Sequence, residues 1–208
     1  MSIEANESQL IQKVLQGDME AMDSLYRRYA GFATAVVLRY VTSDYEARDV
    51  LHDSFLKVFT RISQFRFKGE GSLKAWILRI CANEAIDYLR REKKLSFSDN
   101  VPDVPDDSEP EVERVPAAVL NSMIGKLPAG YRTVLNLYVF EQLSHKEIAQ
   151  RLGIKEDTSA SQFSRAKKLL AKMIQEYIKN KGSGLQTQRR GRWSCRWCTC
   201  RSQRQRCR

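Results

Sequence analysis

Apolar residues recur every three or four positions through most of residues 8–94, and they do so again through residues 116–182. This spacing places them along one face of an α-helix, and no segment shows the strict alternation expected of a half-buried strand. Gly17, Gly31 and the segment 68–71 are expected to interrupt the first helical stretch. The hydrophobic pattern therefore predicts an all-α protein.

Two other segments lack this periodicity. Residues 96–115 hold seven acidic residues and three prolines, which is typical of a solvated linker. Residues 183–208 are rich in Arg, Cys, Gln and Ser, which is typical of a low-complexity tail. We therefore expect two small helical domains, 8–95 and 116–182, joined by an acidic flexible linker and followed by the tail.

The net charge of +10 over 208 residues is a weak sign of nucleic-acid binding, because residues 184–208 alone carry eight arginines and no acid. The rest of the chain carries 27 basic and 25 acidic residues. A case for DNA binding must therefore depend on local charge. No run of about 18 apolar residues predicts a membrane span. The start MSIEANESQL lacks a signal-peptide pattern, so a cytoplasmic protein is expected.

The segment LSHKEIAQRLGIKEDTS carries the strongest local pattern. Ser144 and Glu147 have the spacing of a capping box, and Leu143 and Ile148 have that of a hydrophobic staple, so a short helix is expected to start here. Gly153 then supplies a left-handed turn before a second helix. A short capped helix, a glycine turn and a second helix predict a helix-turn-helix.

The second helix is expected to face outward with a basic surface that suits DNA. The residues expected on this face are Thr158, Ser161, Arg165, Lys168 and Lys172, with Gln162 at its flank. Residues 158–181 hold six basic residues and one acid, Glu176, which favours a polyanionic partner. The alternative is the solvated face of a three-helix bundle.

In the first domain, the segment YEARDVLHDSFLKVF predicts a helix with an acidic outer face. Asp49, His52, Asp53 and Leu56 share that face, and an exposed leucine among acids indicates a docking surface. Asp49, His52 and Asp53 could also be read as metal ligands. No further His or Cys lies nearby to complete a closed site, so no metal and no cofactor are expected.

The following segment, QFRFKGEGS, alternates aromatic and basic residues. Phe65 and Phe67 could stack on unpaired bases while Arg66 and Lys68 hold the phosphates. The alternative is that the two phenylalanines only cap the core. The next helix has a polar stripe that comprises Arg79, Asn83, Asp87, Arg90 and Lys94. Asn83 is the notable member, because an amide can read a base edge with two hydrogen bonds. Trp76 is expected to lie in the core, and the alternative is a platform for base stacking.

These residues together resemble the extracytoplasmic-function group of the sigma-70 family. The resemblance covers about residues 8–182 and rests on four segments in order: AMDSLYRRY, ARDVLHDSFLKVF, FRFKGEGSLKAWILRICANEAIDYLRR and KLPAGYRTVLNLYVFEQLSHKEIAQRLGI. It implies that the first domain is sigma region 2 and that the second domain is region 4. Ala160 departs from the family, whose members commonly have a basic residue there, so the promoter sequence is left open.

The resemblance also implies partners and roles. Asp49, His52, Asp53 and Leu56 would bind the β′ clamp of RNA polymerase core, and the second domain would meet the β flap. The Phe65–Gly71 loop and Asn83 would receive a base flipped from the minus-ten element of promoter DNA. The residues that would contact the same element are Arg79, Asp87, Arg90 and Arg91. The outward residues of the helix-turn-helix would read the minus-thirty-five element. An anti-sigma factor, often membrane-anchored in this family, would be a further partner, and no small-molecule substrate is implied.

Two other functions stay open at this point. A stand-alone helix-turn-helix regulator would bind promoters tightly without polymerase. A hydrolase or phosphorelay enzyme could use His52 and Asp53, but no phosphate loop or nucleophile motif accompanies them, so we expect no enzyme. The tail has C-x2-C-x-C spacing, which allows zinc binding, a disordered nucleic-acid contact or an appendage unrelated to the fold.

Overall fold

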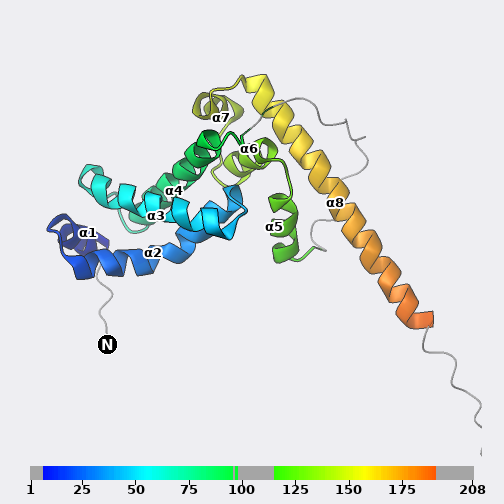
Figure 1. Ribbon diagram of the computed structural model, residues 1–208, viewed down its shortest axis with the longest axis horizontal. Coiled ribbons are helices and arrows are strands. Elements are labelled where there is room, and N and C mark those ends of the chain that lie inside the picture. Colours follow the sequence, from blue (N-terminus) through cyan, green and yellow to red (C-terminus); the bar gives the residue numbers. More distant parts are fainter. Residues whose placement is uncertain (1–6, 96, 98–114, 191–208) are drawn as a thin grey trace, which may run out of the picture.

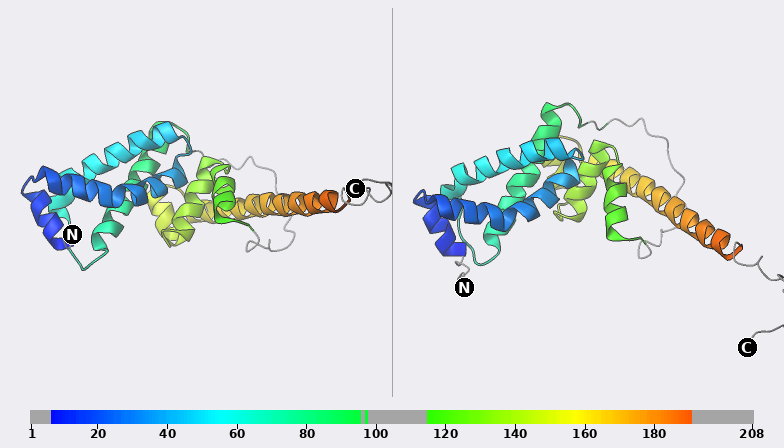
Figure 2. Two further views of the ribbon diagram at one scale, coloured as in Figure 1. Left: turned by 90° about the horizontal axis from the view of Figure 1, so that it is seen from below. Right: turned by 60° about the horizontal axis from the view of Figure 1, so that its bottom comes forward.

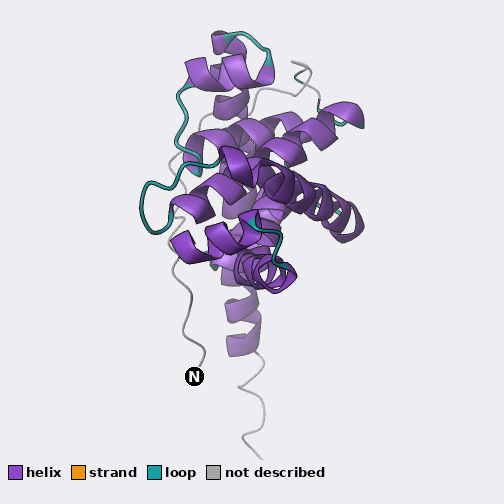
Figure 3. Ribbon diagram, turned by 90° about the vertical axis from the view of Figure 1, so that its left-hand side faces the viewer, coloured by secondary structure: helices purple, strands orange, loops and turns teal. Residues whose placement is uncertain are grey.

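The computed structural model describes residues 7–95, 97 and 115–190, and every regular element in these ranges is helical (Figures 1 and 3). The elements are α1 (Glu7–Leu15), α2 (Met19–Tyr40), α3 (Asp44–Arg61), the 3-10 turn η1 (Ile62–Gln64), α4 (Ser72–Arg91), α5 (Ala117–Gly125), α6 (Ala129–Val139), α7 (His145–Leu152) and α8 (Glu156–Arg190). The all-α prediction is confirmed for this part of the chain. Most of the predicted linker, and the tail beyond residue 190 with its four cysteines, lie outside it.

Short polar residues cap the starts of α2 and α3. Gly17 has a φ of 82°, which lets the chain turn after α1. Asp18 then caps α2 by accepting hydrogen bonds from the backbone N–H groups of Glu20 and Ala21, at 2.9 and 3.2 Å. Ser43 caps α3 in the same way. The prediction of a break at Gly17 is therefore confirmed.

The expected break at Gly31 is wrong, because α2 continues through it from Met19 to Tyr40. A glycine inside a helix costs about 1 kcal/mol relative to alanine. The helix persists because Leu25, Ala33 and Val37, on both sides of the glycine, are fully buried and hold it against the core.

Helices α2, α3 and α4 pack around one apolar core. Leu25, Val58, Leu73 and Ile77 are each fully buried there. Cys81 lies in the same core, and burial raises the pKa of its thiol to about 11. It therefore behaves as a small apolar side chain, as its isolated position in the sequence suggests.

The second domain contains the predicted helix-turn-helix. Both hydrogen bonds of the Ser144–Glu147 capping box are present at the start of α7. Gly153 ends α7 with a φ of 69°, and α8 begins at Glu156. Helix α8 then runs to Arg190, beyond the expected domain end at residue 182, and extends away from the other helices (Figures 1 and 2).

The two domains share one continuous core. Val134 and Leu137 of α6, together with Ile148 and Leu152 of α7, belong to the same buried cluster as the first-domain residues. The contact lies mainly between α2 and α6, with α5 also against α2. Apolar periodicity leaves the packing of the two domains open, and the structure shows them joined (Figure 2).

Polar side chains of α6 cap the carboxyl end of α2 across this boundary. The last carbonyls of a helix have no partner within it. Arg132 donates to the carbonyl oxygen of Tyr40 at 2.8 Å, and Asn136 donates to that of Arg39 at 2.7 Å. Arg132 also donates to the carbonyls of Gly125 and Leu127, at 2.8 and 3.0 Å. The second domain therefore completes a helix of the first.

The capping box gives a direct test of the local fold. We expect Ser144→Ala to lower the free energy of unfolding by about 1 kcal/mol, because the first turn of α7 loses its side-chain acceptor. Denaturant unfolding followed by circular dichroism measures this change. Ser122→Ala, at an exposed position in α5, is the matched control. Equal stability of the two variants would contradict the assigned role of Ser144.

Candidate nucleic-acid interface

Helix α3 carries the predicted acidic face, on which Asp49, His52 and Leu56 are exposed and Asp53 is half-buried. Its inner side is held by Ala47, Val50 and Val58, all buried. Ser54 is buried with them, and its hydroxyl donates to the carbonyl of Val50 at 2.6 Å. The opposite side carries Asp49, His52, Asp53 and Leu56. Leu56 is 51% exposed, so a large apolar side chain is open to solvent beside the acids.

The loop between η1 and α4 presents both aromatic and basic side chains. The Phe65 ring packs against that of Trp76, with centroids 5.1 Å apart, so Phe65 anchors the loop to the domain. Phe67 is 42% exposed, and Arg66 and Lys68 are exposed on either side of it. The two phenylalanines therefore divide the roles left open by the sequence: Phe65 packs inward and Phe67 stays available to a partner.

Gly69 and Gly71 shape the end of this loop with φ values of 116° and 86°. Ser72 stabilises the turn, because its hydroxyl donates to the carbonyl of Gly69 at 2.6 Å and accepts from the N–H of Lys68 at 3.3 Å. Residues other than glycine rarely adopt such φ values. The loop conformation is therefore fixed by local hydrogen bonds as well as by Phe65.

Helix α4 carries the expected polar stripe, and Arg79, Asn83, Asp87 and Arg90 are all exposed. Glu84 lies beside the stripe, but its side chain is only 2% exposed. It pairs with Lys57 of α3 and, at 3.5 Å, with Arg91. The sequence pattern does not reveal the burial of Glu84, because an acid between Asn83 and Ala85 on an amphipathic helix resembles any other surface acid.

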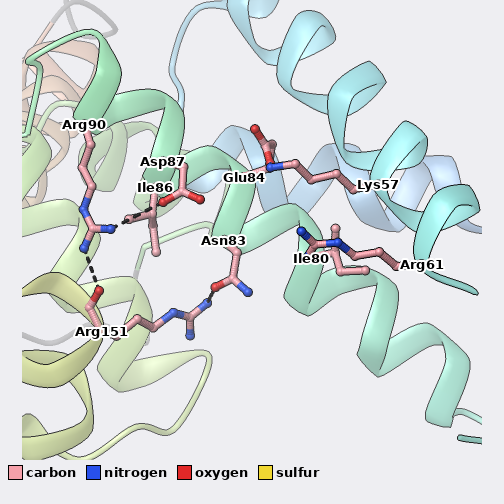
Figure 4. A pocket seen from close by; sticks show the side chains of 9 residues that line it. All are labelled: Lys57, Arg61, Ile80, Asn83, Glu84, Ile86, Asp87, Arg90 and Arg151. Atoms are coloured by element: carbon pink, nitrogen blue, oxygen red, sulfur yellow. Dashed lines mark hydrogen bonds and ion pairs between the residues drawn. The ribbon is translucent and has the colours of Figure 1, made fainter. Parts of the chain in front are cut away.

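A pocket of about 240 Å³ opens where α3, α4 and α7 meet (Figure 4). The residues that line it are Lys57, Arg61, Ile80, Asn83, Glu84, Ile86, Asp87, Arg90 and Arg151. Arg151 comes from the helix-turn-helix and points at Asn83, whose side-chain oxygen accepts a hydrogen bond from its guanidinium group (Figure 4). Arg90 in turn donates to the backbone carbonyl of Arg151 at 2.6 Å. The residue expected to read a base is therefore in contact with the other domain.

The exposed face of α8 differs from the predicted one. Gln162, expected at the flank of this face, is fully buried, and its amide donates to the carbonyl of Phe97 at 3.3 Å. The expectation that Gln162 is exposed is wrong for this conformation. The reason is that the buried side of α8 is wider than the row of apolar residues in the sequence indicates. Ser159 is fully buried on this side as well.

The other predicted residues of α8 remain accessible to different degrees. Thr158, Ser161, Arg165 and Lys168 are half-buried, and Lys172 is exposed. The hydroxyl of Ser161 donates to the carbonyl of Thr158 at 3.0 Å. Ser164 and Lys167 are exposed on the same helix and were not among the residues predicted from the sequence. The outward face is therefore centred closer to Ser164 than to Arg165.

Aromatic contacts hold α7 and α8 in the helix-turn-helix arrangement. The Tyr138 ring of α6 stacks on His145 at 4.8 Å and meets Phe163 of α8 at 4.4 Å. His145 Nδ1 lies 3.0 Å from the hydroxyl of the buried Ser159. These contacts fix the angle between the two helices, and this angle decides which side chains of α8 can enter a groove.

Comparison with known protein families places both domains. Residues 25–95 match the model of sigma-70 region 2, and residues 118–170 match that of sigma-70 region 4. The chain therefore belongs to the sigma-70 family, and within it to the extracytoplasmic-function group.

Individual relatives agree with this assignment. The RNA polymerase sigma-H factor of Pseudomonas aeruginosa is 28% identical over 193 residues, which are 86% of this chain and 99% of the relative. The ECF RNA polymerase sigma-E factor of Escherichia coli K12 is 26% identical over 86% of this chain and all of the relative. Among solved structures, the sigma factor RpoE of Bartonella quintana, in complex with the anti-sigma factor NepR, is 21% identical. Its alignment covers 74% of this chain and 96% of that one, with a TM-score of 0.47.

The described residues contain neither a candidate membrane span nor a candidate metal site. None of the helices in the described ranges is long and apolar enough to cross a membrane. Within the same ranges, no three His, Cys, Asp or Glu side chains gather where they could hold a metal ion, and Asp49, His52 and Asp53 form no such group.

Proposed function

We propose that this protein binds RNA polymerase core and directs it to specific promoters, where the holoenzyme separates the strands and starts transcription. The observation that carries the proposal is the match of both sigma regions in order, each with an accessible polar surface of its own. The protein itself would perform no covalent step in this mechanism. It would supply the geometry in which polymerase meets DNA.

The α3 surface would bind the β′ clamp. Asp49 and Asp53 would attract basic residues of the clamp, and the exposed Leu56 would supply buried apolar area at the centre of the contact. His52 lies exposed between the two acids. A contact of this kind combines fast, charge-steered association with a small apolar anchor.

The loop and the polar stripe of α4 would act on the minus-ten element. Flipping a base out of a duplex costs a few kcal/mol per step, so the protein must offer contacts that duplex DNA lacks. Phe67 would stack on the extruded base, Arg66 and Lys68 would hold the backbone, and Asn83 would bond to a base edge. Arg79, Asp87, Arg90 and Arg91 would extend this surface along the same strand.

The helix-turn-helix would read the minus-thirty-five element. Thr158, Ser161 and Arg165 would reach base edges in the major groove, and Lys168 and Lys172 would contact phosphates. Gln162 joins them only if α8 separates from Phe97. The second domain would also meet the β flap of polymerase, and an anti-sigma protein would be a further partner.

The packing of the two domains affects this mechanism, because the side chain of Asn83 is hydrogen-bonded to Arg151 while the domains are in contact. Reading of the minus-ten element would therefore require α7 to leave α4. Two modest DNA-binding surfaces gain avidity only when their spacing is fixed, and polymerase would fix it. The free protein is accordingly expected to bind promoters weakly.

Binding of labelled promoter DNA tests the proposal. A promoter library is incubated with the protein alone, with core polymerase alone, and with both, and retention is measured in a mobility shift at moderate salt. We expect selective retention only with both. Tight, selective binding by the protein alone would instead identify a stand-alone helix-turn-helix regulator.

Asn83 offers a test at one residue. We expect Asn83→Ala to weaken strand opening about 10- to 100-fold, because a base-edge contact contributes about 1–3 kcal/mol of discrimination. Permanganate reactivity of unpaired thymines in promoter complexes measures the opening. Asn121→Ala, at an exposed site of α5, is the matched control. Unchanged opening by Asn83→Ala would remove this residue from the proposed site.

A further inference from the structure

Glu7 is buried although it is an acid at the first position of α1. Its relative exposure is 3%. One carboxylate oxygen accepts a hydrogen bond from the Tyr29 hydroxyl of α2 at 2.8 Å. The other accepts from the backbone N–H of Gly71 at 2.9 Å, across 64 positions of sequence. One carboxylate therefore joins α1, α2 and the end of the Phe65–Gly71 loop.

Gly71 lies between the loop and α4, so its contact with Glu7 affects the end of the loop and the start of the helix. Gly71 is the N-cap residue of α4, with a φ of 86° and no side chain to cap the helix. The carboxylate of Glu7 lies where two helices begin, α1 and α4, and both helix dipoles favour a negative charge there. The bonds from Tyr29 and Gly71 give each oxygen of the buried Glu7 side chain a donor, which a buried polar group requires. Burial and the bond to Glu7 raise the pKa of Tyr29, so Tyr29 stays a donor.

The loop is thus fixed at both ends and open in the middle. Phe65 holds one end against Trp76, and Glu7 holds the other through Gly71. Arg66, Phe67 and Lys68 between them point to solvent. Holding a binding loop in its bound shape lowers the entropic cost of binding. Glu7 makes no contact that would recognise DNA itself.

We propose that Glu7 is a positioning residue that holds the Phe65–Gly71 loop ready to capture the flipped promoter base. The inference rests on the proposed function of that loop. Glu7 acts through Gly71, so its removal weakens base capture while core binding and recognition by the helix-turn-helix stay unchanged.

The first experiment examines the loop without polymerase. Glu7→Met keeps the length of the side chain and removes both acceptors, and Glu20→Met makes the same change at an exposed site of α2. Amide hydrogen exchange of the full-length protein is compared at Gly71 and Ser72. We expect about 10-fold faster exchange in Glu7→Met alone, because the Gly71 N–H loses its acceptor. Equal rates in the two variants would overturn the hold of Glu7 on the loop.

The second experiment uses holoenzyme and fork-junction DNA from a library-selected promoter. An abasic scan with wild-type protein identifies the unpaired base whose removal weakens binding most. We expect Glu7→Met to bind the intact fork about 10-fold more weakly than wild type and to bind the abasic fork equally well. An equal loss on both forks, or no loss on either, would overturn the positioning role.

Two further comparisons keep the outcomes apart. Glu7→Gln keeps one acceptor and the side-chain shape, so it should fall between wild type and Glu7→Met, and it replaces Glu7→Met if that variant does not fold. If no abasic position weakens the binding of fork-junction DNA by wild-type holoenzyme, the proposed function of the loop is contradicted. In that case the exchange experiment still decides whether Glu7 holds Gly71.

Discussion

Replacing Asp49 and Asp53 together with lysine lowers the affinity for core polymerase by at least about 100-fold. Both residues lie on the solvent side of α3, so the substitutions leave the core of the domain intact. Each reversal turns an attraction into a repulsion, and close interfacial charge pairs have coupling energies of about 1.5 kcal/mol or more. Two such changes amount to about 3 kcal/mol, which corresponds to the stated loss of affinity.

Titration of labelled protein with core polymerase measures this loss. The double variant Glu92→Lys/Glu176→Lys carries the same change in charge on two exposed residues, one directly after α4 and one in α8, and should bind within about threefold of wild type at moderate salt. Equal affinity of the Asp49/Asp53 variant and wild type, with unchanged thermal unfolding, would show that α3 is not the polymerase-binding surface.

Replacing Arg132 with alanine destabilises the protein by about 2–4 kcal/mol and loosens the contact between the domains. Arg132 is only 7% exposed, and its guanidinium group donates to three backbone carbonyls, one of them in the first domain. Burial lowers the pKa of this arginine, since no carboxylate faces it among its described partners. Removal of the side chain leaves the three carbonyls without donors and opens a cavity in the shared core.

Denaturant unfolding measures the loss of stability, and small-angle scattering measures the separation of the domains. Arg27→Ala is the control, because Arg27 forms an exposed ion pair with Asp23 and such pairs contribute about 0–1 kcal/mol. The Arg132 variant should also release Asn83 from its hydrogen bond with Arg151. A variant that keeps wild-type stability and compactness would show that α6 does not hold the two domains together.

The sequence predicts well the features that depend on neighbouring residues. The capping box of α7, the turn at Gly153 and the exposed side of α3 each follow from residues within one or two helical turns, and all three are present. The burial of Gln162 and the unbroken helix at Gly31 were not predicted. Both depend on how the helices pack, and the period of a single helix does not contain that information.

Long-range polar contacts could not be predicted from the sequence, for a related reason. Arg132 meets a carbonyl 92 residues away, and Glu7 meets an N–H 64 residues away. A backbone group looks the same at every position of a sequence, so no pattern of side chains indicates that Arg132 or Glu7 will find one. The contact between Arg151 and Asn83 depends on the packing of two domains and was equally hidden.

Mapping of transcript 5′ ends on a randomised promoter library tests whether this protein directs core polymerase to promoters. Core polymerase is supplied with this protein and, in parallel, with the Asp49→Lys/Asp53→Lys variant. We expect only the wild-type protein to yield discrete start sites, preceded by two sequence elements at a fixed spacing. Start sites that do not differ from those of core polymerase alone would contradict this expectation.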